Sequence, residues 1–184
     1  YYVSYKNGGP EILSHDLTSG RRDRFAAYPG SNISPAVSPD GSKVAMILSK
    51  DGAVDLYVCN TDGGGFRRLT KSREDESSPC WSPDSQWICF ADKSKQRRAP
   101  WKVSPGGGAP VRIATSGISY PTEPDWSPDG SKIAFVANEP DDSSKIYVIN
   151  ADGSGKARLT SNDYRWDEEQ PDWSPDGSKI AFSG

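Results

Sequence analysis

The stretch of sequence that decides the fold is Pro124-Asp125-Trp126-Ser127-Pro128-Asp129-Gly130-Ser131-Lys132-Ile133-Ala134-Phe135. Its central Ser-Pro-Asp-Gly recurs at Ser38 and Ser174, with a Ser-Pro-Asp-Ser variant at Ser82, so that successive copies begin 44, 45 and 47 residues apart. The apolar residue that ends a short basic stretch keeps nearly the same spacing, at Phe25, Leu69, Ile113 and Leu159. Two independent landmarks with one period indicate an internal repeat.

Each repeat predicts four short strands. Proline and aspartate in Ser-Pro-Asp-Gly favour a tight turn between the first strand and the second. The apolar runs that follow the turns, such as residues 133–136, are too short for helices and are typical of strands buried on both faces. A third apolar strand, a glycine-rich turn and an alternating outer strand complete the unit. The pattern predicts an all-β fold, a β-propeller of four-stranded antiparallel blades, with about four blades in this chain.

We expect residues 1–184 to form a single propeller region. The approximate blades are 1–30 (partial), 31–74, 75–118, 119–163 and 164–184 (partial). Residues 1–5 resemble an extra second strand, so the chain begins and stops within blades. Trp81, Trp126 and Trp173, with Val37 in the first unit, are predicted to fill the wedge between blades. Open sheet edges favour self-association, a partner chain or further blades, and the number of blades in a closed ring stays open.

Composition excludes several classes of protein. The 22 basic and 25 acidic residues give a net charge of −3, which argues against a nucleic-acid groove. No apolar run approaches the roughly 20 residues that cross a bilayer. One histidine and three cysteines are too few for a catalytic triad, a zinc site or a thiol relay, so we expect no enzyme activity, cofactor or metal. Pairing in the Ser82 hairpin sets Cys80 opposite Cys89, and we predict free, buried thiols.

Strand order assigns the connections to two faces of the propeller. The Ser-Pro-Asp-Gly turns and the glycine-rich turns fall at one end of the blades, and the second-to-third-strand and blade-to-blade connections fall at the other. The first face is uniform between repeats, and we interpret the aspartates of its turns as backbone caps. The second face carries longer connections that differ between repeats, and variable loops on a rigid frame are where binding usually occurs.

We take the candidate partner-binding residues from the second face, beside the mouth of the channel. They are Tyr28, Gly30, Asn32, Asp75, Glu76, Ser77, Ser78, Tyr120, Thr122, Glu123, Tyr164, Trp166, Glu168, Glu169 and Gln170. Tyr120, Tyr164 and Trp166 are aromatic anchors of the kind that dominate interfaces, although they would serve equally as caps over the blade packing. The acidic stretches 74–76 and 167–169 are typical of solvated loops, and if they converge they would attract a basic partner segment or a hard cation.

The repeat resembles that of the TolB-type propeller family, also called WD40-like or PD40. The resemblance rests on residues 124–135, on Ile146-Tyr147-Val148 and on Arg158-Leu159-Thr160, and the whole repeat occurs in order four times. It implies a periplasmic component of the Tol–Pal cell-envelope system without enzymatic activity. It also implies binding of a Pal-like lipoprotein through the loops at residues 28–32, 75–78, 122–123 and 169–170. The family has six blades and an N-terminal α/β domain, so this chain corresponds to a part of such a propeller.

Three alternatives stay open. The gating propeller of a prolyl-oligopeptidase-like hydrolase would require a Gly-x-Ser-x-Gly elbow and a catalytic histidine outside these residues. A sugar-binding or uronate-cleaving propeller should carry a cluster of metal ligands, and the sequence shows none. A propeller fragment made to study blade assembly would have no native function to assign.

Overall fold

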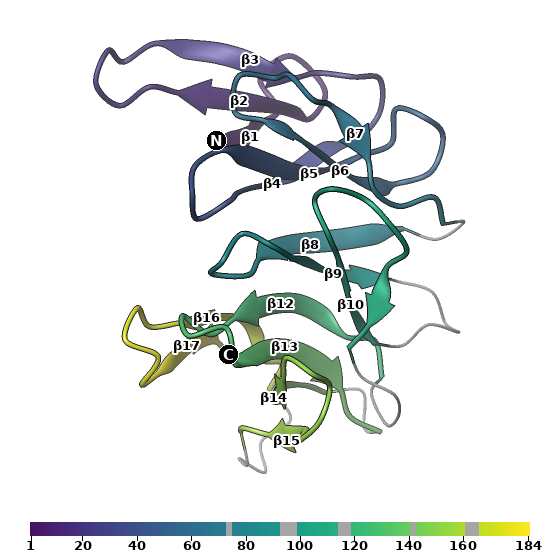
Figure 1. Ribbon diagram of the computed structural model, residues 1–184, viewed down its shortest axis with the longest axis vertical. Coiled ribbons are helices and arrows are strands. Elements are labelled where there is room, and N and C mark those ends of the chain that lie inside the picture. Colours follow the sequence, from purple (N-terminus) through teal and green to yellow (C-terminus); the bar gives the residue numbers. More distant parts are fainter. Residues whose placement is uncertain (73–74, 93–98, 114–118, 141–142, 161–165) are drawn as a thin grey trace.

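The computed structural model describes residues 1–72, 75–92, 99–113, 119–140, 143–160 and 166–184, and the regular elements in these ranges are all strands (Figure 1). The first sheet contains β1 (Tyr2–Ser4), β2 (Glu11–His15) and β3 (Arg22–Ala26). The second contains β4 (Asn32–Val37), β5 (Lys43–Leu48), β6 (Asp55–Asn60) and β7 (Arg67–Arg68). The third contains β8 (Glu76–Trp81), β9 (Ile88–Asp92), β10 (Pro100–Val103) and β11 (Val111–Arg112). The fourth contains β12 (Thr122–Trp126), β13 (Lys132–Asn138), β14 (Ser144–Asn150) and β15 (Ala157–Arg158), and the fifth β16 (Glu169–Trp173) and β17 (Ile180–Ser183).

The sheets are arranged as the blades of a propeller. Strands within each sheet are antiparallel and follow chain order. Between sheets, β4 contacts β8, β8 contacts β12, and β12 contacts β16, so the first strands of successive sheets are neighbours along a common axis. Figure 1 shows the sheets succeeding one another from β1–β3 at one end to β12–β17 at the other. The predicted all-β propeller of four-stranded antiparallel blades is therefore confirmed, including the extra strand β1, which pairs with β2.

The hydrophobic core lies between neighbouring blades. Trp81 of β8 is buried against Ala45 and Ile47 of the preceding blade, and Trp126 of β12 is buried against Cys89 and its neighbours in the third sheet. Trp81 and Trp126 thus fill the wedge as predicted, whereas Trp173 is only partly buried and belongs to neither core cluster. Val37 does not fill the first wedge, since its side chain is exposed.

Each Ser-Pro-Asp turn is closed by its own side chains. Ser127 Oγ donates a hydrogen bond to Asp129 Oδ1 at 2.6 Å, and Ser131 N donates to the same oxygen at 3.0 Å. Ser38 and Asp40, Ser82 and Asp84, and Ser174 and Asp176 repeat the first bond at the same distance. These bonds favour the carboxylate and lower the pKa of Asp129 to about 2. The turn aspartates are therefore backbone caps, as predicted.

The cysteines have the predicted register. Cys80 of β8 is paired directly with Cys89 of β9. Both are free thiols, as is Cys59, and Cys59 and Cys89 are buried whereas Cys80 is half-buried. Burial raises the pKa of the Cys59 thiol to about 11, so this thiol stays protonated at neutral pH.

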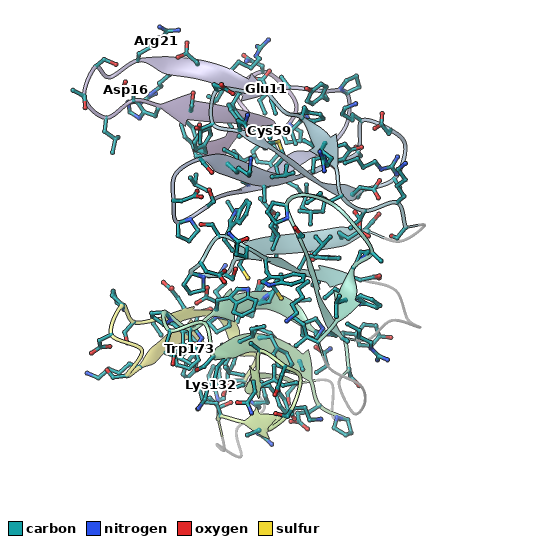
Figure 2. The ribbon with its side chains drawn as sticks, in the orientation of Figure 1. Glu11, Asp16, Arg21, Cys59, Lys132 and Trp173 are labelled. Atoms are coloured by element: carbon teal, nitrogen blue, oxygen red, sulfur yellow. The ribbon has the colours of Figure 1, made fainter. Side chains whose placement is uncertain are left out.

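The two faces of the propeller carry the connections that strand order assigned to them. On one face, here called the turn face, Ser-Pro-Asp turns meet glycine-rich turns: Thr61 N donates to Ser42 O at 3.0 Å and Ala151 N to Ser131 O at 2.9 Å. On the opposite loop face, blade-to-blade segments meet second-to-third-strand segments, as where Ser49 N donates to Ser31 O at 3.1 Å. Figure 2 labels Asp16 and Arg21 on the turn-face hairpin between β2 and β3, with Lys132 and Trp173 near the far end of the arc.

Candidate partner-binding face

A repeated backbone irregularity marks the loop-face end of each first strand. The residue that precedes the strand proline has a left-handed backbone in all four strands: Ser34 (φ 51°), Ser78 (φ 51°), Glu123 (φ 52°) and Gln170 (φ 55°). The strand register shifts across each of these positions. Left-handed non-glycine residues cost about 1–2 kcal/mol each and concentrate where a protein binds or reacts. We call these four residues the pre-proline row.

Hydrogen bonds tie the row of one blade to the next. Gln170 N donates to Glu123 Oε2 at 2.7 Å, and Trp173 N donates to Asp125 Oδ2 at 2.9 Å. Burial raises the pKa of Asp125, while the bond from Trp173 N opposes that rise. The inner strands β12 and β16 are thus fixed relative to each other by two carboxylates.

The loop at residues 28–32 is held from inside by Asn32. This side chain is buried; its Oδ1 accepts from Tyr28 N at 2.8 Å and its Nδ2 donates to Tyr28 O at 2.7 Å. Gly30 has φ 88°, and a Cβ at that position would lie 2.1 Å from Ser49 Oγ. The loop therefore requires glycine at this point and presents Tyr28 in a fixed position.

Glu76 has a comparable place at the start of β8. Its side chain is buried, and Thr70 Oγ1 donates to Glu76 Oε2 at 3.0 Å. Burial raises the pKa of Glu76 to about 7, and repulsion from Asp55 and Asp92 adds to the rise. Glu76, Thr70 and Asp92 line a cleft of about 340 Å³ with apolar walls that include Trp101.

Glu168 stands at the equivalent position before β16 and is paired with a buried lysine. Glu168 is 1% exposed and Lys145 is 2% exposed, with 3.6 Å between Lys145 Nζ and Glu168 Oε1. Lys145 Nζ also donates to Trp166 O at 2.7 Å, and Ile146 N donates to Glu168 Oε2 at 3.2 Å. This network supports from beneath the segment that carries Trp166, whose own side chain is 65% exposed.

The structure sorts the sequence-predicted residues into three groups. Tyr28, Gly30, Asp75, Tyr120, Trp166, Glu169 and Gln170 are exposed, and Ser77, Ser78, Thr122 and Glu123 are partly exposed. Asn32, Glu76 and Glu168 are buried and contact the loops above them, and their direct contact with a partner stays a prediction. Tyr164 lies outside the described residues. Of the acidic stretches, Glu74 also lies outside the described residues.

Sequence reasoning missed three contributors to this face. Ser34 belongs to the pre-proline row, Asp125 joins neighbouring inner strands, and Lys145 supports Trp166. The signal for Ser34 was present, because every first strand carries an Xaa-Pro pair at the same place. The burial of Lys145 could not be predicted, because a charged residue near the end of a strand is ordinarily exposed to solvent.

The described part of the chain shows no group of three or more histidine, cysteine, aspartate or glutamate side chains placed to hold a metal ion. Nor is any helix in that part long and apolar enough to cross a membrane.

Four-stranded antiparallel sheets that pack through their first strands around one axis define a β-propeller. A family model described as the TolB beta propeller domain, PD40, matches residues 1–141. The chain therefore belongs to the PD40 family of TolB-type propellers.

Curated relatives carry the same name. The chain is 35% identical over 162 residues to the Protein TolB homolog of Chlorobaculum tepidum, covering 85% of this chain and 37% of the relative. It is 27% identical over 138 residues to the Tol-Pal system protein TolB of Francisella tularensis subsp. tularensis, covering 73% of this chain and 32% of the relative. The chain thus spans about a third of the length of the relatives it matches.

Solved structures agree on the fold. TolB from Acinetobacter baumannii superimposes with a TM-score of 0.81 at 25% identity, covering 97% of this chain and 44% of that one. An oligogalacturonate lyase in complex with manganese superimposes with a TM-score of 0.70 at 18% identity, covering 93% and 50%. The second likeness shows a shared fold alone, because fold similarity does not carry an activity with it.

Proposed function

We propose that this chain is a non-catalytic, protein-binding propeller of the Tol–Pal cell-envelope system that docks a Pal-like lipoprotein in the periplasm. The relative from Francisella is named a Tol-Pal system protein, which supports the assignment to that system. The docking surface proposed here is the loop face, with the pre-proline row at its centre and Tyr120 and Trp166 as aromatic anchors.

The pre-proline row is the observation that carries this proposal. Four non-glycine residues keep a costly backbone conformation at one place in four successive blades, although turns elsewhere in the chain use glycine for the same purpose. Repeated strain at one end of the inner strands is explained if that geometry presents backbone and side chains to a partner. On the turn face, the four Ser-Pro-Asp turns repeat the same internal hydrogen bonds, which indicates a structural role for that face.

We further propose that residues 1–184 form one propeller region, with blades near 31–74, 75–118 and 119–163 and partial blades at either end. The edges of β1 and β17 are then available for further strands or for self-association. The rival assignments to hydrolase or lyase propellers gain no specific support, because the hydrolase reading depends on a Gly-x-Ser-x-Gly elbow outside these residues and the likeness to the lyase is one of fold.

A pull-down with purified Pal tests the docking surface. The variant Trp166→Ala with Glu123→Ala should lose most of the binding, because it removes an exposed anchor and a member of the pre-proline row. The matched control is Leu17→Ala, which removes an apolar side chain that is at least as exposed but lies on the turn face. Unchanged binding by the double variant, or equal loss in the control, would refute the proposed surface.

A further inference from the structure

Three aromatic rings surround the ammonium group of Lys50. Its Nζ lies 5.3 Å from the ring centroid of Tyr28, 5.8 Å from that of Tyr57 and 5.6 Å from that of Phe66. The rings also contact one another, with centroids 5.5 Å apart for Tyr28 and Phe66 and for Tyr57 and Phe66. Ring faces within about 6 Å attract a cation, and several rings around one point form the kind of cage that recognises ammonium groups.

A carboxylate completes this aromatic cage. Lys50 Nζ donates to Asp51 Oδ1 at 3.3 Å, and Tyr57 Oη donates to Asp51 Oδ2 at 2.8 Å. The hydrogen bond from Tyr57 lowers the pKa of Asp51, which keeps the carboxylate charged at neutral pH. An occupant of the cage therefore meets a hydrogen-bond acceptor as well as three rings.

The cage is rigid and open to solvent on one side. Tyr57 is buried in β6, and Asn32 fixes the backbone of Tyr28 as described above. Tyr28 and Phe66 are 38% and 37% exposed. Lys50 itself comes from the connection between β5 and β6, so its side chain can leave the cage without any strand moving.

The repeat does not need this cage in order to fold. In the fourth sheet, Tyr147 occupies the position that corresponds to Tyr57 in the second sheet. Lys156 occupies the position that corresponds to Phe66. Lys156 Nζ lies 5.8 Å from the ring centroid of Tyr147, and Glu139 accepts the hydrogen bond from Tyr147 Oη at 2.5 Å. In the fourth sheet, Lys156 lies over the ring of Tyr147, whereas in the second sheet three rings lie around Lys50.

We propose that Tyr28, Tyr57, Phe66 and Asp51 form a binding site for a primary alkylammonium group of the kind that a lysine side chain of a partner protein presents. Lys50 occupies the site in the free protein and is displaced by the ligand. The resident lysine shows that the site accepts an alkylammonium group. Its N–H donation to Asp51 favours a primary amine over a quaternary one, which has no hydrogen to donate.

The test uses the full chain and follows its aromatic NMR signals during titration with n-butylammonium. In Lys50→Ala the cage is empty, and we expect saturable shifts of the Tyr28 and Phe66 signals with an apparent Kd at least about tenfold lower than in the parent chain, where the tethered lysine competes. Nα-acetyl-lysine methylamide should bind comparably, which shows that the site accepts a lysine side chain flanked by peptide groups. Tetramethylammonium should bind more weakly, and neutral 1-butanol should not bind saturably.

The matched control is Lys50→Ala with Phe66→Lys, which copies the fourth sheet at the Phe66 position and should abolish binding. Lys50→Gln provides a second open cage if Lys50→Ala proves unstable. The proposal is overturned if neither open-cage variant binds n-butylammonium, if 1-butanol binds as tightly, or if the Phe66→Lys control retains the shifts. None of these outcomes depends on Pal, so they are independent of the pull-down.

Discussion

The substitution Glu168→Gln should destabilise the protein by about 3–5 kcal/mol, which is the usual cost of removing one partner of a buried ion pair. The magnitude follows from the structure, where Glu168 and Lys145 are almost fully buried and their charged atoms are 3.6 Å apart. Without the carboxylate, the Lys145 ammonium keeps the carbonyl of Trp166 as an acceptor but loses the charged carboxylate oxygen that lay 3.6 Å from it. Water cannot replace that charge without opening the blade.

A double-mutant cycle isolates the interaction. Lys145→Met should lower the free energy of unfolding by about 3 kcal/mol by the same reasoning, because it leaves the buried Glu168 carboxylate without this charged partner. The variant that carries both changes should lose less than the sum of the two, with a coupling of about 3 kcal/mol, because no uncompensated charge remains. Lys179→Met serves as the control: Lys179 is exposed, so we expect a change within about 0.5 kcal/mol.

Urea unfolding followed by tryptophan fluorescence measures these free energies, since the chain contains six tryptophans. The reasoning is refuted if Glu168→Gln costs less than about 1 kcal/mol, or if the two single changes add within about 0.5 kcal/mol. Either result would mean that the pair is solvated and does not hold the Trp166 segment.

The remaining predictions concern pH and backbone strain. Because its folded pKa is lowered to about 2 from 3.8, Asp129 contributes stability that is present above about pH 4 and is lost as pH falls towards 2, and Asp129→Asn should flatten this part of a melting-temperature profile. The effect of Glu76 on stability has the opposite pH dependence. Its folded pKa is raised from 4.5 to about 7, so the protein loses stability as pH rises from 4.5 to 7. Glu76→Gln should remove this loss. Gly130→Ala should cost about 1 kcal/mol in urea unfolding, because φ is 72°, although an added Cβ would make only an ordinary contact with Pro83 at 3.7 Å.

The Glu76 and Gly130 predictions each have a control in the same chain. Glu169→Gln changes an exposed carboxylate and should leave the profile between pH 4.5 and 7 unaltered. A Glu76→Gln profile that still falls with rising pH would contradict the assignment. Ser85 occupies the turn position that corresponds to Gly130 and has φ 59°. Its Oγ accepts a hydrogen bond from Asp40 N at 3.2 Å. Ser85→Gly should therefore change stability by less than about 1 kcal/mol, since relief of strain offsets a lost hydrogen bond.

The fold could be predicted because its signals are local. Proline, aspartate and glycine fix the turns within four residues, and the apolar runs fix which strands are buried on both faces. The pairing of Cys80 with Cys89 followed directly from the turn at Ser82. Antiparallel order then placed the connections on two faces without any knowledge of how the blades pack.

The candidate site was predictable only in part. Sequence selected the loop face, but it treated Asn32, Glu76 and Glu168 as surface residues because polar side chains in loops are ordinarily solvated. Their burial depends on the preceding blade, which supplies the backbone of Tyr28, the hydroxyl of Thr70 and the ammonium of Lys145. Lys145 lies 23 residues before Glu168 along the chain, so the strand position of Glu168 alone cannot reveal this partner.

By itself the sequence determined the period, the strand order, the turn chemistry and the separation of a uniform face from a variable one, because each depends on residues close together along the chain. Only the tertiary structure decided the left-handed backbone of Ser34, Ser78, Glu123 and Gln170, since a residue before proline is by itself biased towards extended conformations. The aromatic cage around Lys50 has the same origin. Its rings come from three separate segments, and packing between blades brings them to one point.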